Sequence, residues 1–296
     1  YNPPELRKPL FCHNRMAESF TALFLGALAL SISLRLWLAL RQIRHVRARR
    51  NQVPAEFADR ISAAAHAKAA DYTIARVRFG RVALAVETAL LLTFTLAGGI
   101  DALTGFWQRP ASGSLAGLAL ILSGLAISGA ADMPLAWWRQ FVMEEKFGFN
   151  RMTPRLFVID LLKGALLAAA IGTPVILIVL WLMAAMGSLW WLHVWGFWCA
   201  LNLIIMFVFP TWIAPLFNKF EPLPEGEVRT RVEALLARCG FRSGGLFVMD
   251  GSKRSAHGNA YFTGFGRSKR IVFFAPLLNR LQAPEIEAVL AHELGH

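Results

Sequence analysis

Long apolar stretches constrain the fold of this chain more than any other feature of its sequence. A helix needs about 20 mostly apolar residues to cross the hydrocarbon core of a bilayer, which is about 30 Å thick. Five stretches meet this requirement, and they span residues 19–40, 82–104, 115–137, 156–186 and 189–213. The chain of 296 residues is 56% hydrophobic and only 17% charged, a composition typical of membrane proteins. We therefore expect an all-α polytopic membrane protein whose main partner is the lipid bilayer.

The fourth stretch contains residues that a lipid-facing helix avoids. Asp160 and Lys163 lie in its first turns, and Pro174 lies near its middle. Charged groups inside a membrane segment face a polar interior or leave the hydrocarbon altogether. We expect the first turns to project from the membrane or to face a polar interior.

The basic residues are distributed as in a membrane protein. The net charge is +12, and residues 41–81 contain ten Lys or Arg against three acids. Cytoplasmic loops carry such an excess, so this loop is expected in the cytoplasm, and alternation of the spans places everything after Ile213 there too. Topology explains the charge, so no nucleic-acid partner is expected. The Ala- and Arg-rich composition favours a bacterial source, and hence the bacterial cytoplasmic (inner) membrane.

The composition changes from apolar to mixed after Ile213, which predicts a membrane domain at 1–213 and a second domain at 214–296. Helical spacing of apolar residues predicts an amphipathic helix in "EGEVRTRVEALLARCG". Short apolar runs between turn signals predict strands in "GGLFVMDGS" and "RIVFFAPLL", and an exposed strand in "NAYFTGFG". In "APEIEAVLAHELGH", Pro284, early acids and an apolar stripe predict a final helix. The second domain is therefore expected to be a small α+β unit.

The chain ends in an H-E-x-x-H pattern, formed by His292, Glu293 and His296. On a helix this spacing places two imidazoles one turn apart on one face, where they can bind Zn²⁺. Glu293 then lies about 100° around the helix and acts as general base for a water molecule. The alternative is a surface helix end whose two His residues interact with the helix dipole. His257, in a Gly- and Ser-rich loop, is interpreted as a solvated histidine rather than as a substrate contact.

Several longer stretches resemble the type 1 CAAX prenyl proteases, integral membrane zinc endopeptidases of the gluzincin group. The resemblance rests on "EEKFGFNRMT", "PTWIAPLFNKFEPL", "VMDGSKRSAHGNAYFTGFGRSKRIVFF" and "EIEAVLAHELGH", which occur in the family's order. It implies seven membrane helices, of which the five stretches are the first five, around a water-filled chamber. The zinc site would face that chamber near the cytoplasmic side.

The resemblance also assigns roles to residues. It implies His292 and His296 as ligands of a Zn²⁺ cofactor and Glu293 as the catalytic residue. It implies that Asn259, Ala260 and Tyr261 bind the substrate peptide, because they match an edge strand of the family. The family's third zinc ligand, a Glu, falls beyond His296, so residues 214–296 are expected to form an incomplete metallopeptidase domain. The chain starts at Tyr1 and stops inside the motif, so we expect a truncated segment that is inactive alone.

Three functions are compatible with these observations. The first is a zinc-dependent metalloendopeptidase that hydrolyses peptide or protein substrates near the C-terminus of CAAX-type, prenylated or membrane-associated proteins. The second is a protease for quality control of membrane proteins. The third is non-enzymatic, a polytopic transport or scaffold protein with a vestigial motif. Bound zinc and the effect of replacing Glu293 distinguish the enzymes from the third class.

Overall fold

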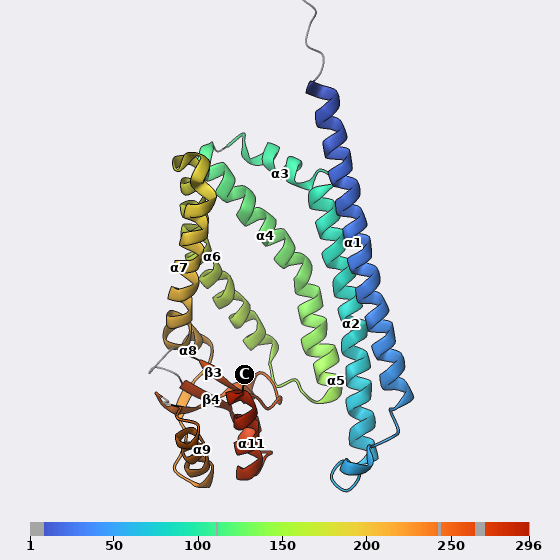
Figure 1. The fold of residues 1–296 in the computed structure, drawn as a ribbon, viewed down its shortest axis with the longest axis vertical. Helices are drawn as coiled ribbons and strands as arrows, with labels where there is room; N and C mark the ends of the chain where they lie inside the picture. Colours follow the sequence, from blue (N-terminus) through green and yellow to red (C-terminus); the bar gives the residue numbers. More distant parts are fainter. Residues whose placement is uncertain (1–8, 111, 242–243, 264–269, 296) are drawn as a thin grey trace, which may run out of the picture. The chain divides into compact units, whose positions relative to one another are not determined.

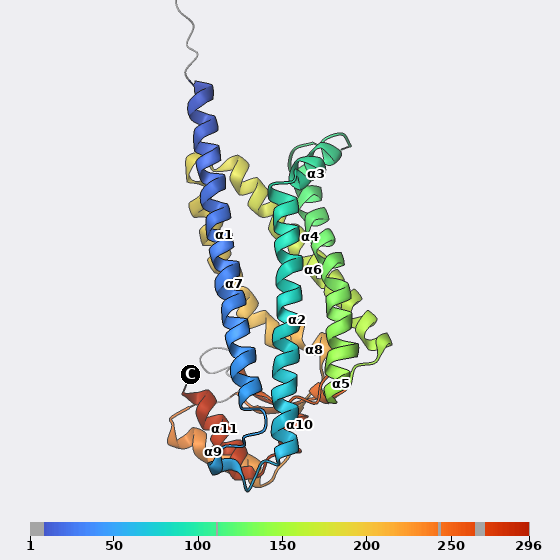
Figure 2. The ribbon, with the colours of Figure 1, turned by 90° about the vertical axis from the view of Figure 1, so that its right-hand side faces the viewer.

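The computed structural model describes residues 9–110, 112–241, 244–263 and 270–295. The chain divides into two compact units, Tyr1–Gly99 and Ile100–His296. In the first unit two long helices, α1 (Pro9–Ala48) and α2 (Ala63–Thr95), pack along each other, as both views show (Figure 1, Figure 2). Their connection includes the short 3-10 helix η1 (Ala55–Phe57). Arg50 donates two hydrogen bonds to Asp71, at 2.8 and 2.7 Å, and thereby ties this connection to α2.

The predicted span 82–104 is not one continuous helix. Helix α2 ends at Thr95 and α3 (Gly99–Trp107) begins after a break. Gly98 has a φ of +77°, a left-handed conformation that ends a helix and that glycine adopts without a steric penalty. The described residues therefore contain four helices long and apolar enough to span a membrane, or five if the bent pair α2 and α3 counts as one span. The two glycines at 98–99 are not polar, so a count of apolar residues does not detect the break and joins the two segments.

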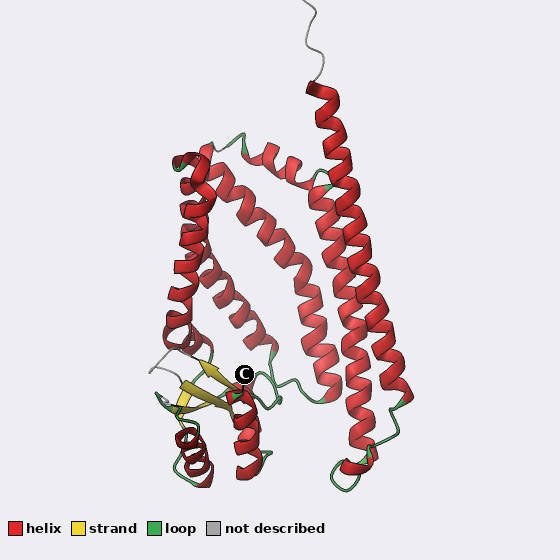
Figure 3. Ribbon diagram, viewed as in Figure 1, coloured by secondary structure: helices red, strands yellow, loops and turns green. Residues whose placement is uncertain are grey.

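The helices of the second unit follow the remaining apolar stretches (Figure 3). Thr153 accepts a hydrogen bond from the Leu156 N–H at 3.2 Å and so caps α6, whose first residue is Pro154. Large apolar side chains on these helices are exposed, including Leu166 at 71% and Trp212 at 75%, as lipid-facing residues are. The bounds are α4 (Gly113–Trp138), η2 (Arg139–Glu144), α5 (Glu145–Phe147), α6 (Pro154–Ala185), η3 (Gly187–Leu189), α7 (Trp190–Val208), η4 (Phe209–Ile213) and α8 (Ala214–Phe217).

A mixed four-stranded sheet follows the helices, in the order β1-β2-β4-β3. Strand β2 pairs in parallel with β4, and the two outer pairs are antiparallel. The predicted strands are present, although residues 264–266 of "NAYFTGFG" lie outside the described residues. Strand β1 was not predicted, because three residues carry no periodicity. The bounds are β1 (Phe220–Pro222), β2 (Leu246–Met249), η5 (Gly251–Lys253), β3 (Ala260–Thr263), β4 (Arg270–Phe274) and α10 (Ala275–Leu278).

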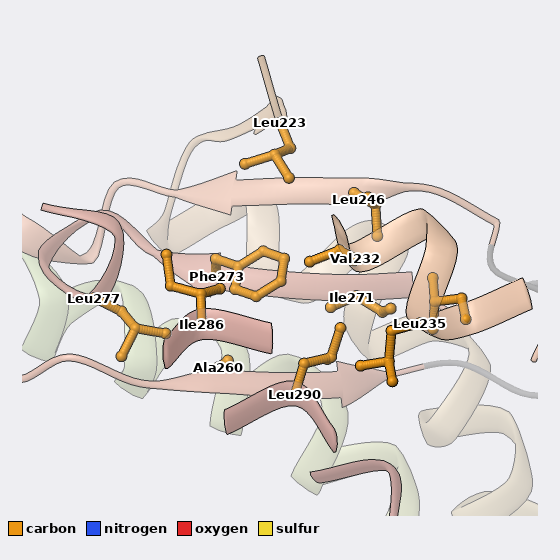
Figure 4. Packing of buried hydrophobic residues seen from close by; sticks show 11 residues of the cluster. Leu223, Val232, Leu235, Leu246, Ala260, Ile271, Phe273, Leu277, Ile286 and Leu290 are labelled. Atoms are coloured by element: carbon orange, nitrogen blue, oxygen red, sulfur yellow. The ribbon is translucent and has the colours of Figure 1, made fainter. Parts of the chain in front are cut away.

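Two helices, α9 (Glu227–Arg238) and α11 (Ala283–Leu294), cover one face of the sheet and enclose the main core (Figure 4). Ile271 and Phe273 of β4 point toward Ile286 and Leu290 of α11, and all four are completely buried. Both helices were predicted from their apolar stripes. Burial of that stripe, rather than intrinsic helix propensity, provides most of their stability.

Candidate metal and peptide site

The last helix, α11, is fixed at its start and along its buried side. The Gln282 N–H donates to Glu285 Oε2 at 2.9 Å, as part of a capping box at the N-terminus. Glu287 accepts a hydrogen bond from Arg238 of α9 at 2.7 Å. At the other end Gly295 still has right-handed helical angles, with φ −75° and ψ −15°. The described part of the H-E-x-x-H pattern therefore has the helical conformation that zinc binding requires.

The motif residues differ in exposure. His292 is exposed, whereas Glu293 is half-buried. Glu293 follows Leu290 by three residues, so it lies on the flank of the helix that packs on the sheet. His296 lies outside the described residues, and among those described no three His, Cys, Asp or Glu side chains gather closely enough to hold a metal. The His292 imidazole on the last helical turn fits the donor chemistry of a zinc site, and the neighbouring Glu293 supplies the carboxylate that the motif requires as a base.

The predicted substrate strand lies at an edge of the sheet. Strand β3 pairs with β4 alone among the described strands. The Phe274 N–H donates to the Asn259 carbonyl at 2.9 Å. In an antiparallel pair, every second residue directs its backbone N–H and C=O toward the partner strand, so Asn259, Tyr261 and Thr263 face β4. Ala260 and Phe262 therefore direct their backbone groups away from β4, toward the open edge. Asn259 Oδ1 already accepts the Ala260 N–H at 2.9 Å, so within the described residues the Ala260 carbonyl and the Phe262 N–H remain for an added strand.

The three predicted substrate residues point in different directions. The Ala260 side chain is buried in the core with Leu290 of α11, so the motif helix packs directly beside β3 (Figure 4). Asn259 is exposed. Tyr261 lies on the opposite face of the sheet, where its ring meets that of Phe274 at 6.0 Å, and burial raises the pKa of its phenol. Backbone of β3, rather than the side chains of Ala260 and Tyr261, is therefore available to a peptide.

His257 is an exposed loop residue, with 46% of its side chain accessible, but it also has specific partners. Its Nε2 lies 3.3 Å from Glu144 Oε2, and its ring stacks on Phe149 with centroids 4.3 Å apart. The Ala256 N–H also donates to the Phe149 carbonyl at 3.0 Å. The "EEKFGFN" stretch, to which sequence analysis assigned no role, thus supports the loop that leads into β3. The two segments lie more than 100 residues apart in the chain, and only the fold brings them together.

Arg254 connects the same loop to two other elements. Its guanidinium donates to both carboxylate oxygens of Asp160 on α6, at 2.7 and 3.0 Å, and to Asn218 Oδ1 at 2.7 Å. Nearby, Lys163 Nζ donates to the Leu216 carbonyl at 3.0 Å. The polar residues in the first turns of α6 therefore have polar partners, and their position outside the hydrocarbon or toward a polar interior stays a prediction. Asp160 and Lys163 fix the start of a membrane helix to the segments around the sheet.

Apolar helices of membrane-spanning length, joined to a small sheet with a motif helix beside its edge strand, define a multi-pass integral membrane protein with a metallopeptidase-like domain. Two family models match it. The model for the CAAX prenyl protease N-terminal region with five membrane helices matches residues 42–219, and the model for peptidase family M48 matches residues 222–296. The chain therefore belongs to the CAAX prenyl protease family of M48 peptidases. Its predicted first span, residues 19–40, lies before the matched region.

Individual relatives agree with the family models. The chain is 45% identical over 174 residues to CAAX prenyl protease 1 of Saccharomyces cerevisiae, covering 58% of this chain and 38% of that one. It is 44% identical over 177 residues to the CAAX prenyl protease 1 homolog of Oryza sativa subsp. japonica, covering 59% and 42%. The Caenorhabditis elegans homolog is 32% identical over 305 residues, covering 93% and 68%. The chain thus spans about two fifths of the length of the yeast and rice relatives.

The fold is also that of a solved structure. The crystal structure of S. mikatae Ste24p superposes with a TM-score of 0.82 at 33% identity, and the match covers 93% of this chain and 65% of that one. The mostly helical membrane architecture with a small sheet is therefore a Ste24p-like fold.

Proposed function

We propose that the protein is a zinc-dependent membrane endopeptidase. The observation that carries the proposal is the direct packing of the H-E-x-x-H helix against an open edge strand. In this assignment His292 and His296 bind Zn²⁺, together with a Glu supplied from beyond this sequence. Zinc, when bound, supplies Lewis-acid activation of a water molecule and of the scissile carbonyl.

Glu293 is the proposed general base and acid. Its carboxylate takes a proton from the attacking water and then donates it to the leaving amine. The half-buried position of Glu293 beside Leu290 supports this role, because packing restricts the rotamers of the side chain and holds it in place. His292 is exposed, which leaves its imidazole accessible to a metal.

We propose that the substrate peptide adds to the sheet as an extended strand along β3. The Phe262 N–H and the Ala260 carbonyl form the main-chain contacts, and Asn259 lies at the start of this edge. Pairing with backbone tolerates many side chains, so β3 alone gives little sequence selectivity. The names of the relatives favour the C-terminal region of CAAX proteins as the substrate, including prenylated or membrane-associated ones.

We propose that the domain at 214–296 faces the cytoplasm. The excess of Lys and Arg in residues 41–81 supports this orientation. The zinc site would then open toward the same side as the C-terminal tails of cytoplasmic proteins. A bacterial inner membrane stays a prediction from composition, and the relatives named above are eukaryotic.

The test uses the full-length protein in detergent with a reporter peptide ending in a CAAX sequence. Glu293→Gln removes the general base and leaves the two His residues in place, so turnover should fall by a factor of about 10² to 10⁴ while bound zinc is retained. Glu287→Gln is the matched control, because Glu287 lies on the same helix but binds Arg238 of α9. Equal cleavage by Glu293→Gln and wild type, or a full-length preparation without zinc, would exclude the proposal.

A further inference from the structure

A concave site lies beside the loop that carries Arg254, and no residue of the H-E-x-x-H pattern lines it. It is an open pocket of about 450 Å³. The buried residues Ala256 and Pro276 line it, together with a set of polar groups. These polar groups are Arg151, Ser252, Ser255, Asn279 and Arg280. The pocket therefore combines two guanidinium groups with two hydroxyls and an amide.

The charge of this pocket is positive and uncompensated within the described part of the chain. No carboxylate lines it, and neither Arg151 nor Arg280 makes an ion pair or a side-chain hydrogen bond to a described residue. Neighbouring cations differ in this respect, since Arg254 is paired with Asp160 and Lys253 with Asp250. Two guanidinium groups facing one cavity match the oxygens of a phosphate better than any neutral ligand.

The two arginines are held on fixed backbone. The Arg151 N–H donates to the Arg254 carbonyl at 3.2 Å, so Arg151 is attached to the loop that forms the opposite wall. The Arg280 N–H donates to the Leu277 carbonyl at 3.2 Å, in the turn that closes α10. The fold therefore fixes the backbone of both cations before any ligand arrives, which lowers part of the entropic cost of binding an anion.

The pocket lies beside the start of a candidate membrane span. Arg151 precedes Pro154, the first residue of α6, by three positions. Val158 and Leu162, which are 48% and 58% exposed, lie about 6 and 12 Å further along that helix at 1.5 Å per residue. The headgroup layer on each side of the hydrocarbon is about 5–8 Å deep. A cation just before the start of an apolar span is therefore within reach of the phosphates of the headgroup layer.

We propose that Arg151 and Arg280 bind the phosphate of an anionic phospholipid in this pocket, with Ser252 and Asn279 as further hydrogen-bond donors. The site is separate from the proposed zinc chemistry, so it does not depend on the proposed function. It would attach the sheet-bearing region to the membrane surface through a lipid, in addition to the covalent connection through α7 and α8.

The experiment counts bound lipid by native mass spectrometry of the full-length protein in neutral detergent, titrated with phosphatidylglycerol or phosphatidylcholine. Wild type should retain phosphatidylglycerol in preference to phosphatidylcholine. Arg151→Ala with Arg280→Ala should weaken phosphatidylglycerol binding about tenfold or more. The control with the same loss of charge is Arg155→Ala with Lys253→Ala, two nearby cations that do not line the pocket, and its binding should change by less than about threefold.

Further measurements identify the source of the phosphate and test whether the variants are folded. Inorganic phosphate at the same concentration should not displace the lipid, and displacement with equal affinity would overturn the assignment to a lipid. Arg151→Lys with Arg280→Lys keeps the charge and should recover part of the binding. Unchanged thermal unfolding of the alanine double variant without lipid shows that it is folded. Equal retention of phosphatidylglycerol by that variant and by wild type would also overturn the proposal.

Discussion

The Arg254–Asp160 pair allows a quantitative test of how α6 supports the loop that leads into β3. Both side chains are largely buried, with 22% and 16% of their surfaces exposed, and the guanidinium makes three hydrogen bonds. Removing one partner of a fully buried pair costs about 3–5 kcal/mol, because the other charge is left desolvated. An exposed pair contributes at most about 1 kcal/mol. With this intermediate exposure, we expect Arg254→Ala to lower the free energy of unfolding by about 2–4 kcal/mol.

The neighbouring residue provides the control. Lys253 pairs with Asp250, but its side chain is 57% exposed, so Lys253→Ala should cost less than about 1 kcal/mol. The assay is thermal unfolding of the full-length protein in detergent, followed by Trp fluorescence, with Asp160→Ala and the double variant completing a cycle. The double variant should be no less stable than Arg254→Ala, because it removes the orphaned carboxylate. Equal effects of Arg254→Ala and Lys253→Ala, or strictly additive effects in the cycle, would refute the reasoning.

Three further predictions concern the sheet and its helices. Burial raises the pKa of Tyr261 above its usual value of about 10. Above pH 10 the unfolded state therefore holds fewer protons than the folded state, and stability falls as pH rises. Tyr261→Phe should remove this component, and ultraviolet difference titration can detect it because the chain has only three Tyr. Leu290→Ala should destabilise the core by about 2–5 kcal/mol, measured by thermal unfolding. Glu285→Ala, which breaks the capping box of α11, should cost about 0.5–2 kcal/mol in the same assay, and no measurable change would show that the cap does not stabilise the helix.

Local patterns predicted the elements of this fold well. The apolar length rule located α1, α4, α6 and α7, and the stripe after Pro284 located α11. The same rule joined α2 and α3, because it counts apolar residues and does not register the left-handed φ of Gly98. Strand β1 was not predicted either, because a three-residue strand is defined by its pairing with β2 and not by its own sequence pattern. Sequence analysis therefore missed one local backbone conformation, at Gly98, and one strand that depends on its pairing with a second segment.

The same distinction applies to the candidate site. His292 and Glu293 are recognisable because the motif lies within one helix, and their metal and catalytic roles stay predictions. The support of the edge strand could not be predicted, since Glu144 and His257 meet across 113 positions and Asp160 and Arg254 across 94. The sequence indicated only that Asp160 lies outside the hydrocarbon or faces a polar interior, and the structure shows that it anchors the loop that leads into β3. A substitution at the start of a membrane helix should therefore weaken peptide binding at the sheet, although the residue is remote from the motif.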